Sequence, residues 1–235
     1  VDKIIFVSKW VQNRFFDNLD NKLINKTEII YPSIHREKKI YKKDKKITFV
    51  GKLNESKGYD IYKNAVIKIL DEFNNWKAFS IGDESRVRPK INHKNHKELG
   101  FLKHKKVLQF LNKSEIVVVP SRWEEPFGRT ALESASRACA TIISRKGGLP
   151  ETTTSAVILK KLNSKDLFDE INELIKDKKK LLKLQRENYK NFIFNHNYIT
   201  NIIDNIRKTI KNKKNVNIFN TKKKKYFKDN AYNKF

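Results

Sequence analysis

The stretch that decides the fold is residues 115–133, "EIVVVPSRWEEPFGRTALE". Its apolar first half predicts a buried strand, and the small and apolar residues after Gly128 predict a helix. Glu125 and Glu133 therefore bracket a strand-to-helix turn. Open α/β sheets bind their ligands at such turns, so both acids are candidate site residues.

The same alternation of strand and helix extends outward along the chain. Helices are predicted at 55–73, 103–114, 130–140 and over most of 164–212, and strands at 46–53, 76–83, 97–102, 115–121, 140–148 and 155–160. Strands that alternate with helices indicate a parallel sheet with helices on both faces. Two further strands are predicted at 3–7 and 27–32, with Ser8 as the N-cap of a helix between them.

These patterns divide the chain into segments. Residues 34–45 are polar and rich in lysine, which is typical of a linker, and residues 213–235 have little periodicity, which is typical of a mobile basic tail. The expected segments are an N-terminal unit at 1–33, the linker at 34–45, an α/β domain at 46–198, a helix at 199–212 and the tail at 213–235.

Composition leaves several classes of protein open. The net charge of +26 suits a nucleic-acid binder or contact with an anionic membrane surface. The lysines are spread along the chain rather than gathered in one patch, which favours compositional bias. No apolar run reaches the roughly 20 residues that cross a bilayer, and no secretory signal is visible. The absence of methionine suggests a fragment of a longer protein.

Cys139 is the only cysteine, which excludes an intrachain disulfide and favours a reducing compartment. It lies in the run "SRACAT", where small neighbours favour a buried structural thiol over a nucleophile.

Glycine turns follow three of the predicted strands, at Gly51, at Gly128 and at 147–148. Glycine lets the backbone approach a ligand, and the helix that follows offers free N–H groups to a phosphate. Lys52 and Lys57 stand in the first of these turns, where two ammonium groups could neutralise a diphosphate without a metal. The alternative is that both are solvated lysines in a lysine-rich chain.

The two acids suit the two ends of a nucleotide-sugar. Glu133 falls one to two turns into its helix, where a carboxylate can accept hydrogen bonds from both ribose hydroxyls. Glu125 precedes the helix, near the place of a sugar beyond the diphosphate, and the N–H groups near Phe127 and Gly128 face the phosphates between. Alternatively, both are surface acids near a helix N-terminus, where acids are favoured.

Three stretches in order carry a resemblance to a known family: "FVGKLNESKG" (49–58), "SIGDE…LGFL" (80–102) and "VVVPSRWEEPFGRTALESASRACATIISRKGGLPE" (117–151). They resemble the donor-binding half of the retaining GT-B glycosyltransferases marked by Glu-x7-Glu. The resemblance implies a GT-B type α/β fold, a Rossmann-like parallel sheet with a remnant of the N-terminal acceptor domain. The helix within 197–210 resembles the segment that crosses back to that domain.

The resemblance also implies roles for the site residues. Glu125 contacts the transferred sugar, Glu133 the ribose, and Lys57 the diphosphate. Position 52 is normally Arg in this family, and Lys52 keeps the charge without the bidentate fork. The family's catalytic-site histidine, which lies in the acceptor domain, has no counterpart among the five histidines. There is no Asp-x-Asp, and "HKNH" (93–96) is a weak candidate for a metal site.

The sequence thus predicts the donor-binding portion of a bacterial-type retaining hexosyltransferase. The expected ligands are a nucleotide-diphospho-sugar and a sugar or lipid-linked acceptor, used in lipopolysaccharide or other cell-envelope synthesis without metal or cofactor. A cytoplasmic location is expected, with possible peripheral membrane contact. The alternatives are an inactive nucleotide-sugar-binding fragment, a nucleic-acid-binding protein, and a sugar-nucleotide epimerase on the same fold.

Overall fold

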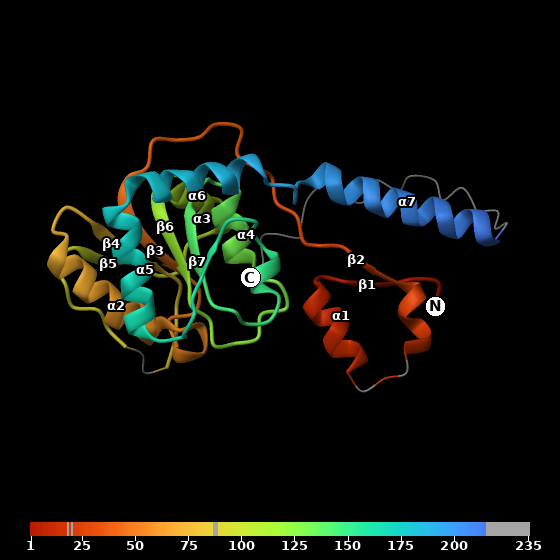
Figure 1. Ribbon diagram of the computed structural model, residues 1–235, viewed down its shortest axis with the longest axis horizontal. Helices are drawn as coiled ribbons and strands as arrows, with labels where there is room; N and C mark the ends of the chain where they lie inside the picture. The colour runs from red at the N-terminus through yellow and green to blue at the C-terminus, as the bar shows by residue number, and fades with distance from the viewer. Residues whose placement is uncertain (18, 20, 87–88, 215–235) are drawn as a thin grey trace.

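A computed structural model describes residues 1–17, 19, 21–86 and 89–214. The larger part is a sheet covered by helices, and the smaller is an N-terminal unit built on two strands (Figure 1). The predicted tail lies outside the described residues, except for 213 and 214, which end the last helix.

The main sheet has six strands that all run parallel, in the order β5-β4-β3-β6-β7-β8. Numbered within this domain, that is 3-2-1-4-5-6, the order of the doubly wound dinucleotide-binding fold. The strand order reverses between β3 and β6. The strands are β3 (Asp44–Val50), β4 (Lys77–Ile81), β5 (His96–Glu98), β6 (Ser114–Val119), β7 (Ala140–Ile143) and β8 (Val157–Ile158).

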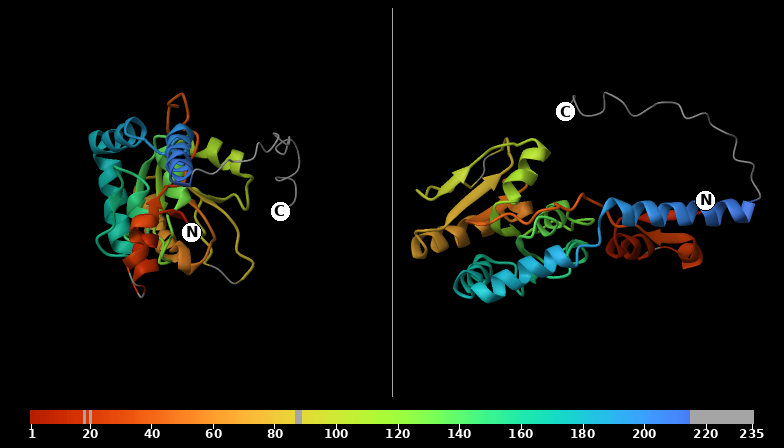
Figure 2. Two further views of the ribbon diagram at one scale, coloured as in Figure 1. Left: turned by 90° about the vertical axis from the view of Figure 1, so that its right-hand side faces the viewer. Right: turned by 90° about the horizontal axis from the view of Figure 1, so that it is seen from above.

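Helices cover both faces of this sheet, as predicted (Figure 2). On one face α2 (Tyr59–Glu72) and α5 (Ser164–Lys176) pack against the sheet, and α6 (Lys178–Lys190) adds Leu181 to the same core. On the other face α3 (His104–Leu111) and α4 (Arg129–Ala135) enclose a second apolar core. The central strands β6 and β7 are buried along their whole length because both faces are covered.

The N-terminal unit contains β1 (Ile4–Phe6), α1 (Lys9–Phe16), a 3₁₀ turn η1 (Asn21–Lys26) and β2 (Thr27–Ile29). β1 and β2 pair in parallel. Ser8 is the N-cap of α1, as predicted, because its Oγ accepts from the Val11 N–H at 3.1 Å. From the α/β domain, α7 (His196–Lys214) extends toward the side where this unit lies (Figure 1).

An aromatic cluster joins this unit to the α/β domain. Tyr31 packs on Phe127 and Phe194 with ring centroids 5.5 and 5.3 Å apart, and Phe127 and Phe194 pack edge to face. The cluster lies beside the turn that carries Glu125.

The predicted helices differ from those observed in their bounds: α3 ends at Leu111 instead of residue 114, and two further differences have a clear backbone cause. The helix predicted at 130–140 ends at Ala135, because Ala138 adopts left-handed backbone with φ +56° and the Cys139 N–H donates to Ser134 O at 3.0 Å. The helix predicted from residue 55 begins at Tyr59. A 3₁₀ turn, η2 (Glu55–Lys57), precedes it, and Gly58 with φ +73° separates the two.

The bounds of the predicted strands also differ from those observed, most of all for β7, which ends at Ile143 instead of residue 148. β5 occupies His96–Glu98 instead of 97–102, and β3 begins at Asp44, inside the segment predicted as linker. The segment boundaries themselves stay a prediction. Cys139 is fully buried, as predicted, and burial raises the pKa of its thiol. Among the described residues, no helix is both long and apolar enough to cross a membrane.

Candidate functional site

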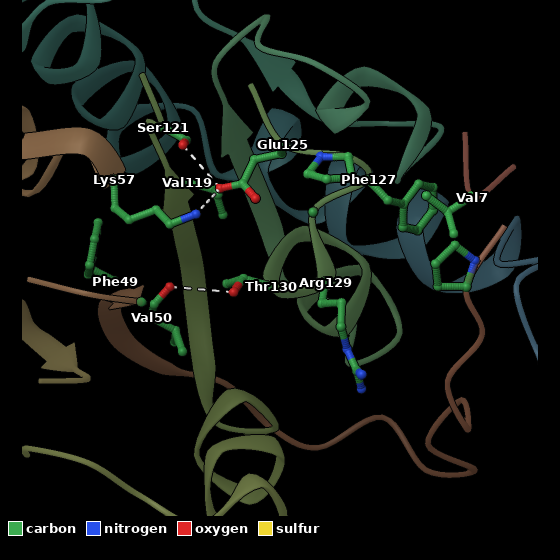
Figure 3. Close-up of a pocket in the computed structure, with 14 residues that line it drawn as sticks. Val7, Phe49, Val50, Lys57, Val119, Ser121, Glu125, Phe127, Arg129 and Thr130 are labelled. Atoms are coloured by element: carbon green, nitrogen blue, oxygen red, sulfur yellow. Dashed lines mark hydrogen bonds and ion pairs between the residues drawn. The ribbon is translucent and has the colours of Figure 1, made fainter. Parts of the chain in front are cut away.

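A crevice of about 380 Å³ lies where the strand order reverses, beyond the carboxyl ends of β3 and β6 (Figure 3). Side chains and backbone from three parts of the chain enclose it. The N-terminal unit and the segment after it contribute Val7 and Pro32, the β3–η2 region contributes Phe49, Val50, Gly51 and Lys57, and the β6–α4 region contributes Val119, Ser121, Glu125, Pro126, Phe127, Gly128, Arg129 and Thr130. Ligands of doubly wound sheets bind at this position.

The polar centre of the crevice is an ion pair between Lys57 and Glu125. Lys57 Nζ donates to Glu125 Oε1 at 2.6 Å, and Ser121 Oγ donates to the same oxygen at 3.1 Å. The side chains of Lys57 and Glu125 are only 29% and 16% exposed. The carboxylate of Glu125 is therefore held in a fixed position beyond the carboxyl end of β6.

Backbone contacts with a second glycine turn support Glu125. The Gly148 N–H donates to Glu125 O at 2.7 Å. Gly147 has φ +58°, and a Cβ there would collide with the Glu125 backbone. Only glycine readily adopts this positive φ and leaves room for the Glu125 backbone, so the glycine turn at 147–148 is needed to hold Glu125 in this position.

Five of the seven predicted site residues meet at the crevice: Gly51, Lys57, Glu125, Phe127 and Gly128. Phe127 is buried in the aromatic cluster described above, so its ring forms the wall of the crevice. The turns after β3 and β6 therefore meet at this crevice, and the ligand roles predicted for these five residues stay predictions.

Lys52 and Glu133 do not line the crevice. Lys52 is exposed. Glu133 is 6% exposed, and its Oε1 lies 2.9 Å from His104 Nε2 and 3.7 Å from Arg129 Nε. The predicted ligand roles of Lys52 and Glu133 stay predictions.

Sequence reasoning missed several residues at or beside the site. Ser121, Arg129 and Thr130 line the crevice and His104 pairs with Glu133. A signal for Ser121 was available, because it follows the strand-ending Pro120 directly. No local signal existed for His104, which reaches Glu133 only because α3 and α4 share one face of the sheet.

The histidines of "HKNH" lie apart from the crevice. His93 pairs with Asp71 at 3.3 Å, and His96 Nε2 lies 2.9 Å from Ser80 Oγ. Burial lowers the pKa of His96 to about 4. In the part of the chain that the structure describes, no three His, Cys, Asp or Glu side chains cluster as metal ligands do.

A parallel sheet of this order, with a crevice at its switch point, is the doubly wound α/β fold, in which ligands such as nucleotides bind at this position. Residues 31–191 match the family described as Glycosyl transferases group 1. The chain belongs to this family, and its fold is that of the GT-B glycosyltransferases.

Similar proteins come from archaea and bacteria. An uncharacterized glycosyltransferase of Methanocaldococcus jannaschii is 34% identical over 202 residues, covering 81% of this chain and 54% of that protein. An uncharacterized 41.2 kDa protein in the cps region of Klebsiella pneumoniae is 29% identical over 140 residues, covering 59% of this chain and 37% of that protein. The chain thus spans about half or less of the curated relatives it matches.

Solved structures share the fold at low identity. Anabaena HepE in complex with UDP superposes with a TM-score of 0.75 at 18% identity, covering 90% of this chain and 64% of HepE. HepE in complex with UDP-glucose gives a TM-score of 0.73 with the same identity and coverage.

Proposed function

We propose that this chain binds a nucleotide-diphospho-sugar in the crevice and is the donor-binding portion of a glycosyltransferase. The observation that carries the proposal is the Lys57–Glu125 pair, held by Ser121 at the switch point of the sheet. Family membership and the UDP and UDP-glucose complexes of HepE support it.

The proposed chemistry is electrostatic. Lys57 stands between Glu125 and the β3 turn, so its ammonium group can contact a diphosphate while it keeps the carboxylate in place. Stabilising the leaving diphosphate lowers the barrier to breaking the bond at the anomeric carbon. Glu125 accepts hydrogen bonds from the hydroxyls of the transferred sugar and so orients that carbon.

Glu133 is the proposed ribose ligand. Its carboxylate is positioned by His104, one helical turn beyond the start of α4. Ribose hydroxyls bound there would extend the ligand from the crevice over the first turn of α4. The exposed Lys52 supplies a further positive charge near the phosphates.

The finer features of the activity are also proposals. Transfer with retention and a hexose as the sugar follow from the Glu-x7-Glu resemblance. The acceptor is a sugar or lipid-linked saccharide of the cell envelope, for which the cps-region relative in Klebsiella is the supporting observation. We propose a cytoplasmic reaction without a metal ion, with peripheral contact between lysine side chains and an anionic membrane.

Calorimetric titration of this chain with UDP, GDP and their sugars, first without metal and then with magnesium, tests the proposal. We expect metal-independent binding of one diphosphate and weaker binding by Glu133→Ala. Strictly magnesium-dependent binding would contradict the metal-free site. Binding of nucleotides and sugar nucleotides, without transfer by the chain when it is joined to an acceptor domain, would favour an inactive binding protein. Salt-sensitive binding of DNA or RNA alone would favour the nucleic-acid alternative.

A further inference from the structure

A carboxylate of the α/β domain caps the helix of the N-terminal unit. Glu151, in the 3₁₀ turn η3 (Leu149–Glu151), accepts from the backbone N–H of Lys9 at 2.7 Å and of Trp10 at 2.9 Å. These groups belong to the first turn of α1, whose N–H groups have no partner within the helix. The negative charge of Glu151 also suits the positive end of the helix dipole.

Tyr31 adds a second link between Glu151 and the N-terminal region. Burial, together with a hydrogen bond to Glu151, raises the pKa of the Tyr31 hydroxyl to about 12. The Tyr31 ring packs on Phe127 in the crevice wall. One carboxylate thus connects α1, the segment after β2 and the edge of the crevice.

The N-cap of α1 makes a third link, directly to the loop that carries Glu125. Ser8 is fully buried, and its Oγ donates to Pro126 O at 2.5 Å while accepting from Val11 N–H. Ser8 Oγ also stands against Gly148, where an added Cβ would lie 3.0 Å from it. Gly148 in turn donates to Glu125 O.

These contacts form a continuous connection from α1 to Glu125. We propose that Glu151 is a positioning residue: by holding the N-terminus of α1, it presses Ser8 onto the 125–128 loop and so sets the place of Glu125 in the crevice. The inference rests on the proposed function only where it assigns Glu125 to the donor sugar. The position of the N-terminal unit and the geometry of the sugar subsite then depend on each other.

Amide hydrogen exchange in this chain tests the connection without any ligand. In Glu151→Ala, the Lys9 and Trp10 amides should exchange about tenfold faster, the size expected for a lost helix cap. The amides of Gly148 and Leu132 donate to Glu125 O and Gly128 O. Their exchange rates should rise by at least about threefold, because the loop at 125–128 loosens.

Ser8→Ala breaks the connection from the other end and leaves the η3 sequence intact. It should speed exchange at Gly148 and Leu132 as well. Glu151→Gln keeps only one of the two acceptor oxygens, so it should restore protection at one of the two amides, Lys9 or Trp10, and part of the protection at Gly148 and Leu132. The matched control is Glu124→Ala, which removes an exposed neighbouring carboxylate that pairs with Lys146 and should leave α1 unaffected.

Two results overturn the proposal. If Lys9 and Trp10 accelerate while Gly148 and Leu132 keep their rates in both Glu151→Ala and Ser8→Ala, Glu151 is a helix cap alone. If Lys9 and Trp10 do not accelerate, the cap does not form in solution. Should Glu151→Ala fail to fold, Ser8→Ala and Glu151→Gln decide the question.

The ratio of the Kd values for UDP and UDP-glucose gives a second test, because a role of Glu151 in stability alone would leave this ratio unchanged. Glu151→Ala should leave the Kd for UDP within about twofold and should remove most of the difference between UDP and UDP-glucose. An unchanged ratio in a variant that binds normally contradicts the role in the sugar subsite. If the wild-type chain binds neither ligand, the proposed function fails for this chain, and the exchange rates still decide whether Glu151 positions the loop.

Discussion

The Lys57–Glu125 pair offers a quantitative test of how strongly the crevice is organised before any ligand binds. Lys57→Met keeps the apolar stem and removes the charge, and Glu125→Gln keeps the shape and removes the carboxylate. At 4 Å and an effective dielectric constant near 20, two unit charges attract by about 4 kcal/mol. Desolvation and lost side-chain entropy oppose this attraction.

The net coupling follows from the burial of the two side chains. Exposed pairs contribute about 0.2–1 kcal/mol, and removing one partner of a fully buried pair costs about 3–5 kcal/mol. With Lys57 29% and Glu125 16% exposed, the pair lies between these cases. We expect a coupling free energy of about 1–2 kcal/mol in a double-mutant cycle.

Urea unfolding of the wild type, both single variants and the double variant measures this coupling, provided that the m-values agree. The exposed Lys183–Glu187 pair, at 3.9 Å, serves as the control and should couple by less than about 0.5 kcal/mol. A Lys57–Glu125 coupling no larger than the control's would refute the reasoning, because it would mean that the carboxylate is not held in the ligand-free crevice.

Three further predictions concern ligand binding, backbone and pH. Glu133→Ala should weaken nucleotide binding by roughly 1.5–3 kcal/mol, the size of a charged hydrogen bond. Glu125→Ala should leave nucleotide affinity nearly intact and should abolish sugar transfer when the chain is joined to an acceptor domain. If calorimetry shows an equal loss of nucleotide affinity in both variants, the assignment of Glu125 to the sugar and Glu133 to the ribose is wrong. Gly147→Ala should lower the free energy of unfolding by more than about 2 kcal/mol, because its Cβ meets the Glu125 backbone, whereas Gly100→Ala, also at positive φ but in open space, should cost about 1 kcal/mol. If urea unfolding shows similar losses of stability in Gly147→Ala and Gly100→Ala, the predicted collision of the new Cβ with the Glu125 backbone does not occur. Because burial lowers the pKa of His96 to about 4 from about 6.5 in the unfolded chain, the unfolded state takes up the proton first as the pH falls. Stability should therefore be full above pH 6.5 and fall by about 1–2 kcal/mol toward pH 4; a His96→Gln variant with the same pH dependence of unfolding would contradict this.

Local patterns were sufficient to predict the elements that build the site. Apolar runs, helical spacing and the glycine turns placed Gly51, Lys57, Glu125 and Gly128 at the ends of strands, and these residues meet in the crevice. The limits of individual elements were less accurate. The end of α4 is set by the left-handed backbone of Ala138, and no local sequence pattern makes an alanine adopt that conformation.

What the sequence by itself determined was the class of fold and five of the residues that line the crevice, because strand and helix periodicity and turn chemistry act over a few neighbouring residues. Only the tertiary structure decided which side chains pair across the molecule. Lys57 meets Glu125, Glu133 meets His104, and Glu151 caps a helix that begins 142 residues earlier. Such pairs depend on the strand order and on the docking of the N-terminal unit, which arise from packing of the whole chain and leave no periodic signal in the sequence.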